Sequence, residues 1–138
     1  MENKSMFRAF FFTFLIITSL ELQANEEPKC NAAGNQLELN ACALDEFSKA
    51  DKDLNETYQS LIKRQGDNLI FISKLRLAQK TWVIFRDADI AARFACSEGD
   101  VHTCWGSIYT MSFLYRKAEL TRERTKHLGE ILKDGPGK

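Results

Sequence analysis

The chain has 138 residues, of which 44% are hydrophobic and 28% charged, and its 19 basic and 19 acidic residues balance to a formal net charge of zero. A neutral total gives no support for a nucleic-acid-binding protein or for binding to an anionic membrane surface. The charge is nevertheless uneven, because residues 25–60 carry eight acids and three bases, and residues 61–138 carry nine acids and fourteen bases. The structural interpretation of this distribution is an acidic first helix that packs beside basic later helices. The functional interpretation is an acidic surface that binds a cationic partner.

The start of the chain has the pattern of a secretory signal peptide. Lys4 and Arg8 form a basic region, residues 9–20 are uncharged and apolar, and Ala24 offers a small residue at the cut. The apolar run is shorter than the roughly 20 residues that span a bilayer. We therefore expect residues 1–24 to be removed and residues 25–138 to form a single domain that is periplasmic or secreted.

All four cysteines lie in this exported part. An even number of cysteines in an oxidising compartment predicts two disulfide bonds, and four cysteines allow three pairings. The pairing that closes two short local loops is favoured, whereas a zinc site needs shorter spacings and nearby histidines. The expected bonds are Cys30–Cys42 and Cys96–Cys104, with no metal and no cofactor.

The first helix is expected over residues 36–64. Asn35 followed by Glu38 resembles a capping box, and Gly66 is a candidate for a left-handed helix end. Asp67 or Asn68 then offers a cap for the next helix. The predicted buried stripe of this first helix recurs at helical spacing and consists of Leu39, Cys42, Ala43, Phe47, Ala50, Leu54, Tyr58, Leu61 and Ile62.

The second helix is expected over residues 69–95. Its apolar residues are spaced by three and four, which places them on one helix face. The predicted buried face consists of Leu75, Ala78, Trp82 and Phe85.

A loop or short turn follows, and a third helix is expected over residues 108–132 with Ser107 as its cap. Its predicted inward residues are Met111, Leu114, Tyr115, Ala118, Thr121, Thr125, Leu128 and Leu132. No strand-like alternation is sustained anywhere. The sequence therefore predicts an all-α fold, a small up-and-down bundle of three long helices clipped by disulfides, with room for a fourth short helix in the N-terminal arm or the disulfide loop.

The chain offers little catalytic chemistry. No serine or cysteine nucleophile stands near a histidine in a known order, and no phosphate-binding loop is present in the sequence. Paired acids on the predicted helices are interpreted as solvated faces. The sequence therefore argues against an enzyme, and no catalytic residue is assigned.

The two histidines of the exported chain and Trp105 are the side chains to weigh for a functional role. His127 lies in a basic last part of the third helix, where it is most simply solvated. His102 and Trp105 lie in the disulfide loop and form a candidate partner-binding surface, since aromatic residues are enriched at binding hot spots. The alternative for Trp105 is that it plugs the end of the bundle.

A set of polar residues falls near the predicted inner faces. We interpret it as an inter-helix network that fixes helix register rather than as a ligand site. Within it, the Arg86 fork is suited to bind helix ends or a carboxylate of a neighbour, such as Glu119 or Glu123 of the last long helix. The network consists of Tyr58, Gln79, Arg86, Asp87 and Arg124.

Four motifs occur in order along residues 25–138: QxELNxCA (36–43), ADxxLNxxY (50–58), AQxxWxxFRDA (78–88) and LTxxRxxxL (120–128). Together they resemble the LprI-type lysozyme inhibitor family, and the resemblance covers nearly the whole exported chain. One position departs from the family pattern, because Ile90 stands where many relatives have a cysteine.

The resemblance implies a small, helical, disulfide-linked envelope protein whose partner is a lysozyme. Inhibition would proceed by occlusion of the lysozyme cleft, with the loop at His102 and Trp105 as the first candidate surface and the acidic first helix as the second. The alternative is a structural or chaperone-like envelope protein of unknown client, again without catalytic activity.

Overall fold

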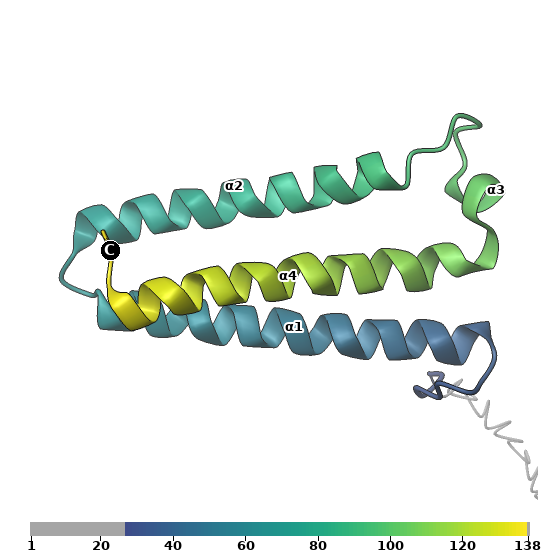
Figure 1. Cartoon of the computed structure of the whole chain (residues 1–138), viewed down its shortest axis with the longest axis horizontal. Helices are drawn as coiled ribbons and strands as arrows, with labels where there is room; N and C mark the ends of the chain where they lie inside the picture. Colours follow the sequence, from purple (N-terminus) through teal and green to yellow (C-terminus); the bar gives the residue numbers. More distant parts are fainter. Residues whose placement is uncertain (1–26, 138) are drawn as a thin grey trace, which may run out of the picture.

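The computed structural model describes residues 27–137, and the expected signal peptide, residues 1–24, lies outside that part of the chain. Three long helices, one short helix and a 3-10 turn make up the described fold (Figure 1). In chain order these are α1 (Gln36–Arg64), α2 (Leu69–Arg93), α3 (Val101–Trp105), η1 (Gly106–Ile108) and α4 (Tyr109–Asp134).

The prediction of an all-α bundle is confirmed. α2 runs back against the direction of α1, and α4 returns beside α1 in the same direction as α1 (Figure 1). Between residues 27 and 137 there is no strand, and the short helix α3 lies in the disulfide loop. None of the helices in this range is long and apolar enough to cross a membrane.

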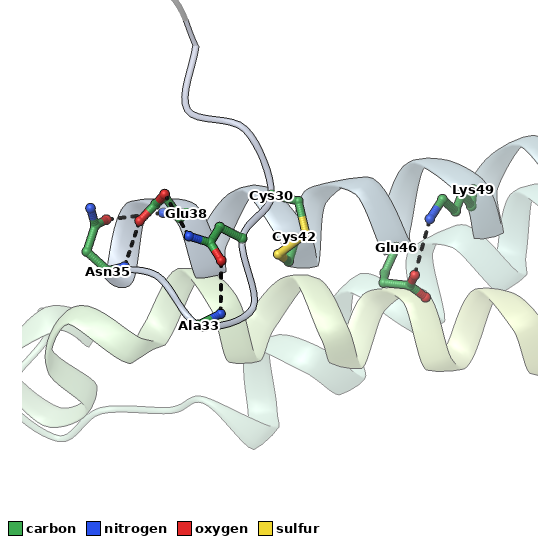
Figure 2. The surroundings of a disulfide bond; sticks show 8 residues. Cys30, Ala33, Asn35, Glu38, Cys42, Glu46 and Lys49 are labelled. Atoms are coloured by element: carbon green, nitrogen blue, oxygen red, sulfur yellow. Dashed lines mark hydrogen bonds and ion pairs between the residues drawn. A yellow bond between two sulfur atoms is a disulfide. The ribbon is translucent and has the colours of Figure 1, made fainter.

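The start of α1 is fixed by local interactions that the sequence predicts. The Asn35 side chain accepts hydrogen bonds from the backbone N–H groups of Leu37 (2.9 Å) and Glu38 (3.3 Å), and Glu38 accepts one from the Asn35 N–H (2.8 Å). Figure 2 shows this capping box beside the Cys30–Cys42 disulfide, which fastens the N-terminal arm to α1. Both features are confirmed.

The turn between α1 and α2 differs in part from expectation. Asn68 caps α2 by accepting from the Phe71 N–H at 3.0 Å, as predicted. Gly66 does not adopt a left-handed conformation, so that prediction is wrong; Gln65 ends the helix with φ −104°. A hydrogen bond from the Asn68 N–H to the Gln65 carbonyl, 2.8 Å, closes the turn without a left-handed residue.

The start of α4 also differs from expectation. Ser107 was predicted as its cap, but it lies inside η1 and no side chain caps α4. The reason is that Ile108 already has helical backbone angles, so the chain passes from η1 into α4 without an extended cap residue. The second helix is also shorter than predicted, because Phe94 is the C-cap of α2.

α1 and α4 pack closely along their lengths, whereas α2 lies farther from both (Figure 1). Small buried residues allow the close approach: Ala43 and Ala50 on α1, and Ala118 and Thr121 on α4, are all nearly inaccessible to solvent. Helices approach more closely where the side chains between them are small. α2 packs against the core through larger side chains, among them Trp82.

The buried face of α2 is not the one predicted from the apolar spacing. Leu75 is buried and Trp82 half-buried, as expected, but Ala78 is exposed and Phe85 is 62% exposed. Tyr115 of α4, predicted inward, is also exposed. The residues of α2 that are buried are Ile72, Leu75, Arg86 and Ile90.

Two apolar clusters form the core, one at each end of the bundle. Leu54, Leu61, Leu75 and Leu128 make the first, near the α1–α2 turn. The second, near the disulfide loop, consists of Ile90, Phe94 and Leu120, with Tyr109 and Phe113 packed against it. Along α2 and α4 the polar side chains of Arg86 and Arg124 lie between these two clusters.

Candidate functional site

The end of the bundle that carries α3 is built by a disulfide and a cap. The Cys96–Cys104 bond joins the segment after α2 to α3, which confirms the predicted pairing. Asp100 caps α3, since its side chain accepts from the His102 N–H at 2.9 Å. Gly106 follows with φ +59°, a conformation that favours glycine, and turns the chain into η1.

Aromatic rings hold α3 against the rest of the bundle. Phe94, only 5% exposed, lies at the centre of this cluster. The ring of Trp105 meets it edge-on with centroids 5.1 Å apart, and the ring of Tyr109 does so at 5.6 Å. His102 packs edge-on against Tyr109 at 5.3 Å. Edge-to-face pairs of this kind add stability beyond the apolar area they bury.

His102 and Trp105, the candidate partner-binding residues, lie in this same short helix. His102 is exposed, and Trp105 is 36% exposed although one side of it contacts Phe94. Trp105 therefore has both an inner contact and a free surface. The structure brings the two residues together at one end of the molecule, and their role in binding a partner stays a prediction.

A cavity of about 680 Å³ opens beside Trp105, between the end of α2 and the first half of α4. Three arginines contribute to its wall, together with Trp105, Tyr115 and Glu119. These arginines are Arg93, Arg116 and Arg122.

The arginines of this cavity differ in how they are paired. Arg116 binds Glu119 at 2.9 Å and Asp89 at 3.3 Å. The hydrogen bond to Glu119 raises the pKa of Arg116 above its ordinary value, and burial opposes that shift. Arg122 lies 3.4 Å from Glu46 of α1, whereas Arg93 forms no ion pair with any residue between 27 and 137.

Sequence reasoning missed these three arginines. The excess of basic residues after position 60 was a signal that the cationic surface lies on the later helices. It could not indicate that residues from two separate helices meet beside Trp105.

The predicted polar network lies at the middle of the bundle, away from α3. Arg124 of α4 donates from Nε to the Gln79 side-chain oxygen of α2 at 3.1 Å. The centroid of the Trp82 ring lies 5.1 Å from the guanidinium carbon of Arg86 and 6.0 Å from that of Arg124. Burial lowers the pKa of Arg124, because desolvation disfavours its charged form.

Arg86 does not bind the carboxylate that was expected. It is 6% exposed, and both its Nε and its Nη2 lie 2.8 Å from Oδ1 of Asp87, the next residue of α2. Glu119 is paired with Arg116 instead. The expectation of an Arg86 bond to Glu119 or Glu123 is therefore wrong, because a nearer carboxylate on the same helix takes the guanidinium.

The remaining residue of the network, Tyr58, lies in a groove of about 260 Å³ between α1 and α2. Gln79 and Arg86 line the same groove, and Arg124 and Asp87 join them through the bonds described above. The structure thus brings the network residues into one region. Whether they serve only helix register stays a prediction.

Residues 27–137 contain no group of three or more His, Cys, Asp or Glu side chains arranged to hold a metal ion. His127 is exposed on α4 and takes no part in either region.

Comparison with known proteins gives a family match over most of the described chain. The family described as Lysozyme inhibitor LprI matches residues 28–128, which include α1, α2, α3 and most of α4. An uncharacterized protein of Rhizobium meliloti (strain 1021) is 32% identical over 117 residues, covering 77% of this chain and 80% of the relative. No solved structure matches the chain.

Proposed function

The chain belongs to the LprI lysozyme inhibitor family, and on this basis we propose that it is an extracytoplasmic inhibitor that binds a lysozyme and occludes its cleft. The two disulfide bonds support a place outside the cytoplasm, because such bonds persist in oxidising compartments. In this proposal the signal peptide at residues 1–24 directs export, and the exported chain, residues 25–138, acts without catalysing a reaction.

The observation that carries the proposed mode of binding is the chemistry of the α3 end. His102 and Trp105 are both exposed there, and Arg93 lines the cavity beside Trp105 without a carboxylate partner between residues 27 and 137. Lysozymes cleave glycosidic bonds with a pair of carboxyl groups. An unpaired guanidinium can bind a carboxylate through two hydrogen bonds, and an adjacent indole can fill an apolar part of the cleft.

The acidic side of α1 suits a second role in the same proposal. Asp45, Glu46 and Glu56 lie on α1, and Asp45 is exposed without an ion pair to any residue of the described range. A surface of this charge accelerates the encounter with a cationic enzyme, and the effect weakens as salt concentration rises.

The test measures lysis of bacterial cell walls by several types of lysozyme in the presence of the purified, disulfide-bonded protein. We expect inhibition of at least one type, and we expect Trp105→Ala and Arg93→Gln each to weaken it by at least about tenfold, as for central interface residues. Leu69→Ala and Arg76→Gln serve as matched controls, because both residues are exposed and lie in the first part of α2, at the end opposite α3.

Absence of inhibition of every lysozyme at micromolar excess would contradict the proposal as a whole. Inhibition that is unchanged in folded Trp105→Ala and Arg93→Gln proteins would contradict the α3 end as the binding surface, while leaving the inhibitor function standing.

A further inference from the structure

The face of α2 that points away from α1 and α4 carries a row of exposed apolar residues, with Lys74 and Thr81 between them. Ile70, Leu77 and Ile84 follow one another at intervals of seven residues and are 78%, 60% and 63% exposed. Ala88 and Ala91, also exposed, continue the row toward the end of the helix. No residue between 27 and 137 covers this row, and in Figure 1 α2 lies at the edge of the bundle.

Such a surface is unusual for an outer helix. Helices at the surface of a globular protein normally carry polar residues opposite their buried stripe. In α2 the buried stripe contains Arg86 and the half-buried Gln79, whereas the solvent side contains the large apolar residues. A shallow, mainly apolar hollow that includes Leu77 and Phe85 extends this surface along one flank. An exposed apolar row of this kind marks an interaction surface.

The distribution of side-chain sizes along the row indicates what covers it. The large residues Ile70 and Leu77 lie in the first half of α2, and the small residues Ala88 and Ala91 lie in the second half. We propose that the occupant is a second copy of this chain, with the two α2 helices packed antiparallel around a two-fold axis near Ile84. In that arrangement the large Leu77 of one copy lies opposite the small Ala91 of the other, while Ile70 lies beyond the overlap of the two helices.

The charges along one edge of the row fit the same arrangement. Lys80 and Asp87 are both exposed and are seven residues apart, so they lie on the same side of the helix. With the axis between Val83 and Ile84, Lys80 of each copy faces Asp87 of the other. Asp87 binds Arg86 through Oδ1 alone, which leaves Oδ2 to accept from Lys80. A parallel pair would instead bring opposite edges of the row together, so that Lys80 of one copy would not meet Asp87 of the other.

The length of the helix sets the expected strength. α2 has 25 residues and is therefore about 37 Å long. An antiparallel pair centred on Ile84 overlaps over residues 75–93, about 28 Å, and buries less than the roughly 800 Å² per partner of a standard stable interface. The dimer is therefore expected to dissociate in the micromolar range. Its two disulfide loops lie toward opposite ends of the helix pair, because each follows the C-terminal end of its own α2.

The first experiment is sedimentation of the purified, disulfide-bonded protein from low to high micromolar concentration. A monomer–dimer equilibrium is expected, and Ile84→Glu should raise its dissociation constant by at least about tenfold, because each copy would place a charge at the apolar centre. Leu44→Glu on the exposed side of α1 is the matched control and should leave the equilibrium unchanged. Circular dichroism verifies that both variants keep their helices.

The second experiment tests the orientation with a short bismaleimide cross-linker. All four native cysteines are held in disulfides, so a single added cysteine provides the sole reactive thiol. Ile84→Cys should cross-link to its counterpart near the axis, whereas Leu77→Cys should not, since two copies of residue 77 would lie about 20 Å apart along the helix axis. A parallel dimer would cross-link at both positions.

Several outcomes would overturn the inference. They are a monomer at every concentration, a dimer that Ile84→Glu does not weaken, and efficient cross-linking of Leu77→Cys. A monomer in which Ile84→Glu abolishes lysozyme inhibition would show that this face serves the lysozyme instead. The dimer does not depend on the proposed inhibition, so a failure of either proposal leaves the other testable.

Discussion

Arg124 of α4 and Gln79 of α2 are joined by a hydrogen bond of 3.1 Å, between two helices whose backbones approach each other at few places. This bond crosses between two helices and lies between the two apolar clusters of the core. It connects residues from two of the four sequence motifs. It therefore provides a specific attachment where apolar packing is sparse.

Gln79→Leu should lower the free energy of unfolding by about 1–2 kcal/mol, because it leaves the half-buried Arg124 without this hydrogen bond. Gln79→Glu keeps an acceptor at the same place and should recover most of the loss. Urea unfolding followed by circular dichroism measures both values. A Gln79→Leu protein as stable as the parent would show that the bond contributes nothing.

Asp87→Asn should destabilise the protein by about 1–3 kcal/mol, since Arg86 is buried and loses the carboxylate that balances its charge. Arg86→Met in the same chain removes the buried charge and should restore part of the stability. Glu56→Gln is the control: the Lys52–Glu56 pair is exposed at 3.8 Å, and its loss should cost less than about 0.5 kcal/mol. Equal losses in Asp87→Asn and Glu56→Gln would contradict the account of Arg86.

Ala50→Leu should destabilise the fold by about 1–3 kcal/mol, because Ala50 is 2% exposed where α1 approaches α4 and a larger side chain forces the helices apart. Ser48→Leu places the same side chain on the exposed side of α1 and should change stability little. Thermal unfolding of the two variants gives the comparison. A tolerated leucine at position 50 would mean that the α1–α4 contact is looser than described.

Replacing Cys96 and Cys104 with serine should lower stability by about 2–3 kcal/mol in the chain-entropy model of a short closed loop. Under the proposed function it should also weaken lysozyme inhibition, because α3 is held by this bond and by the aromatic cluster around Phe94. Replacement of Cys30 and Cys42 should lower stability comparably and leave inhibition in place. Lysis assays below the unfolding temperature separate the two effects, and equal inhibition by both variants would argue against the α3 end.

Much of this fold can be predicted from the sequence, because its signals are local. The bounds of α1, its capping box at Asn35 and both disulfide pairings follow from residues a few positions apart. The buried face of α2 could not be predicted in the same way. Leu75 and Trp82 fit a helix face that also contains Ala78, and they fit equally well a face that contains Arg86. Apolar spacing favours the face with Ala78, whereas the structure buries the face with Arg86.

The partners of Arg86 on its own helix decide between the two stripes. Arg86 is buried because Asp87 pairs with it and Trp82 lies beneath its guanidinium, which offsets the cost of burying the charge. The cavity beside Trp105 was equally beyond sequence reasoning, since Arg93 and Arg116 come from different helices. The candidate loop with His102 and Trp105 could be located from the sequence, but its cationic neighbour Arg93 could not.

The loose packing of α2 has a consequence for local unfolding. Neither disulfide joins α2 to α1 or α4, so α2 can separate while the close α1–α4 pair stays intact. In native-state hydrogen exchange, backbone amides in the middle of α2 should therefore exchange faster than those around Ala50 and Ala118. The molecule then has a stable two-helix unit and a separable third helix, and any partner that covers α2, including a second copy, would slow that exchange.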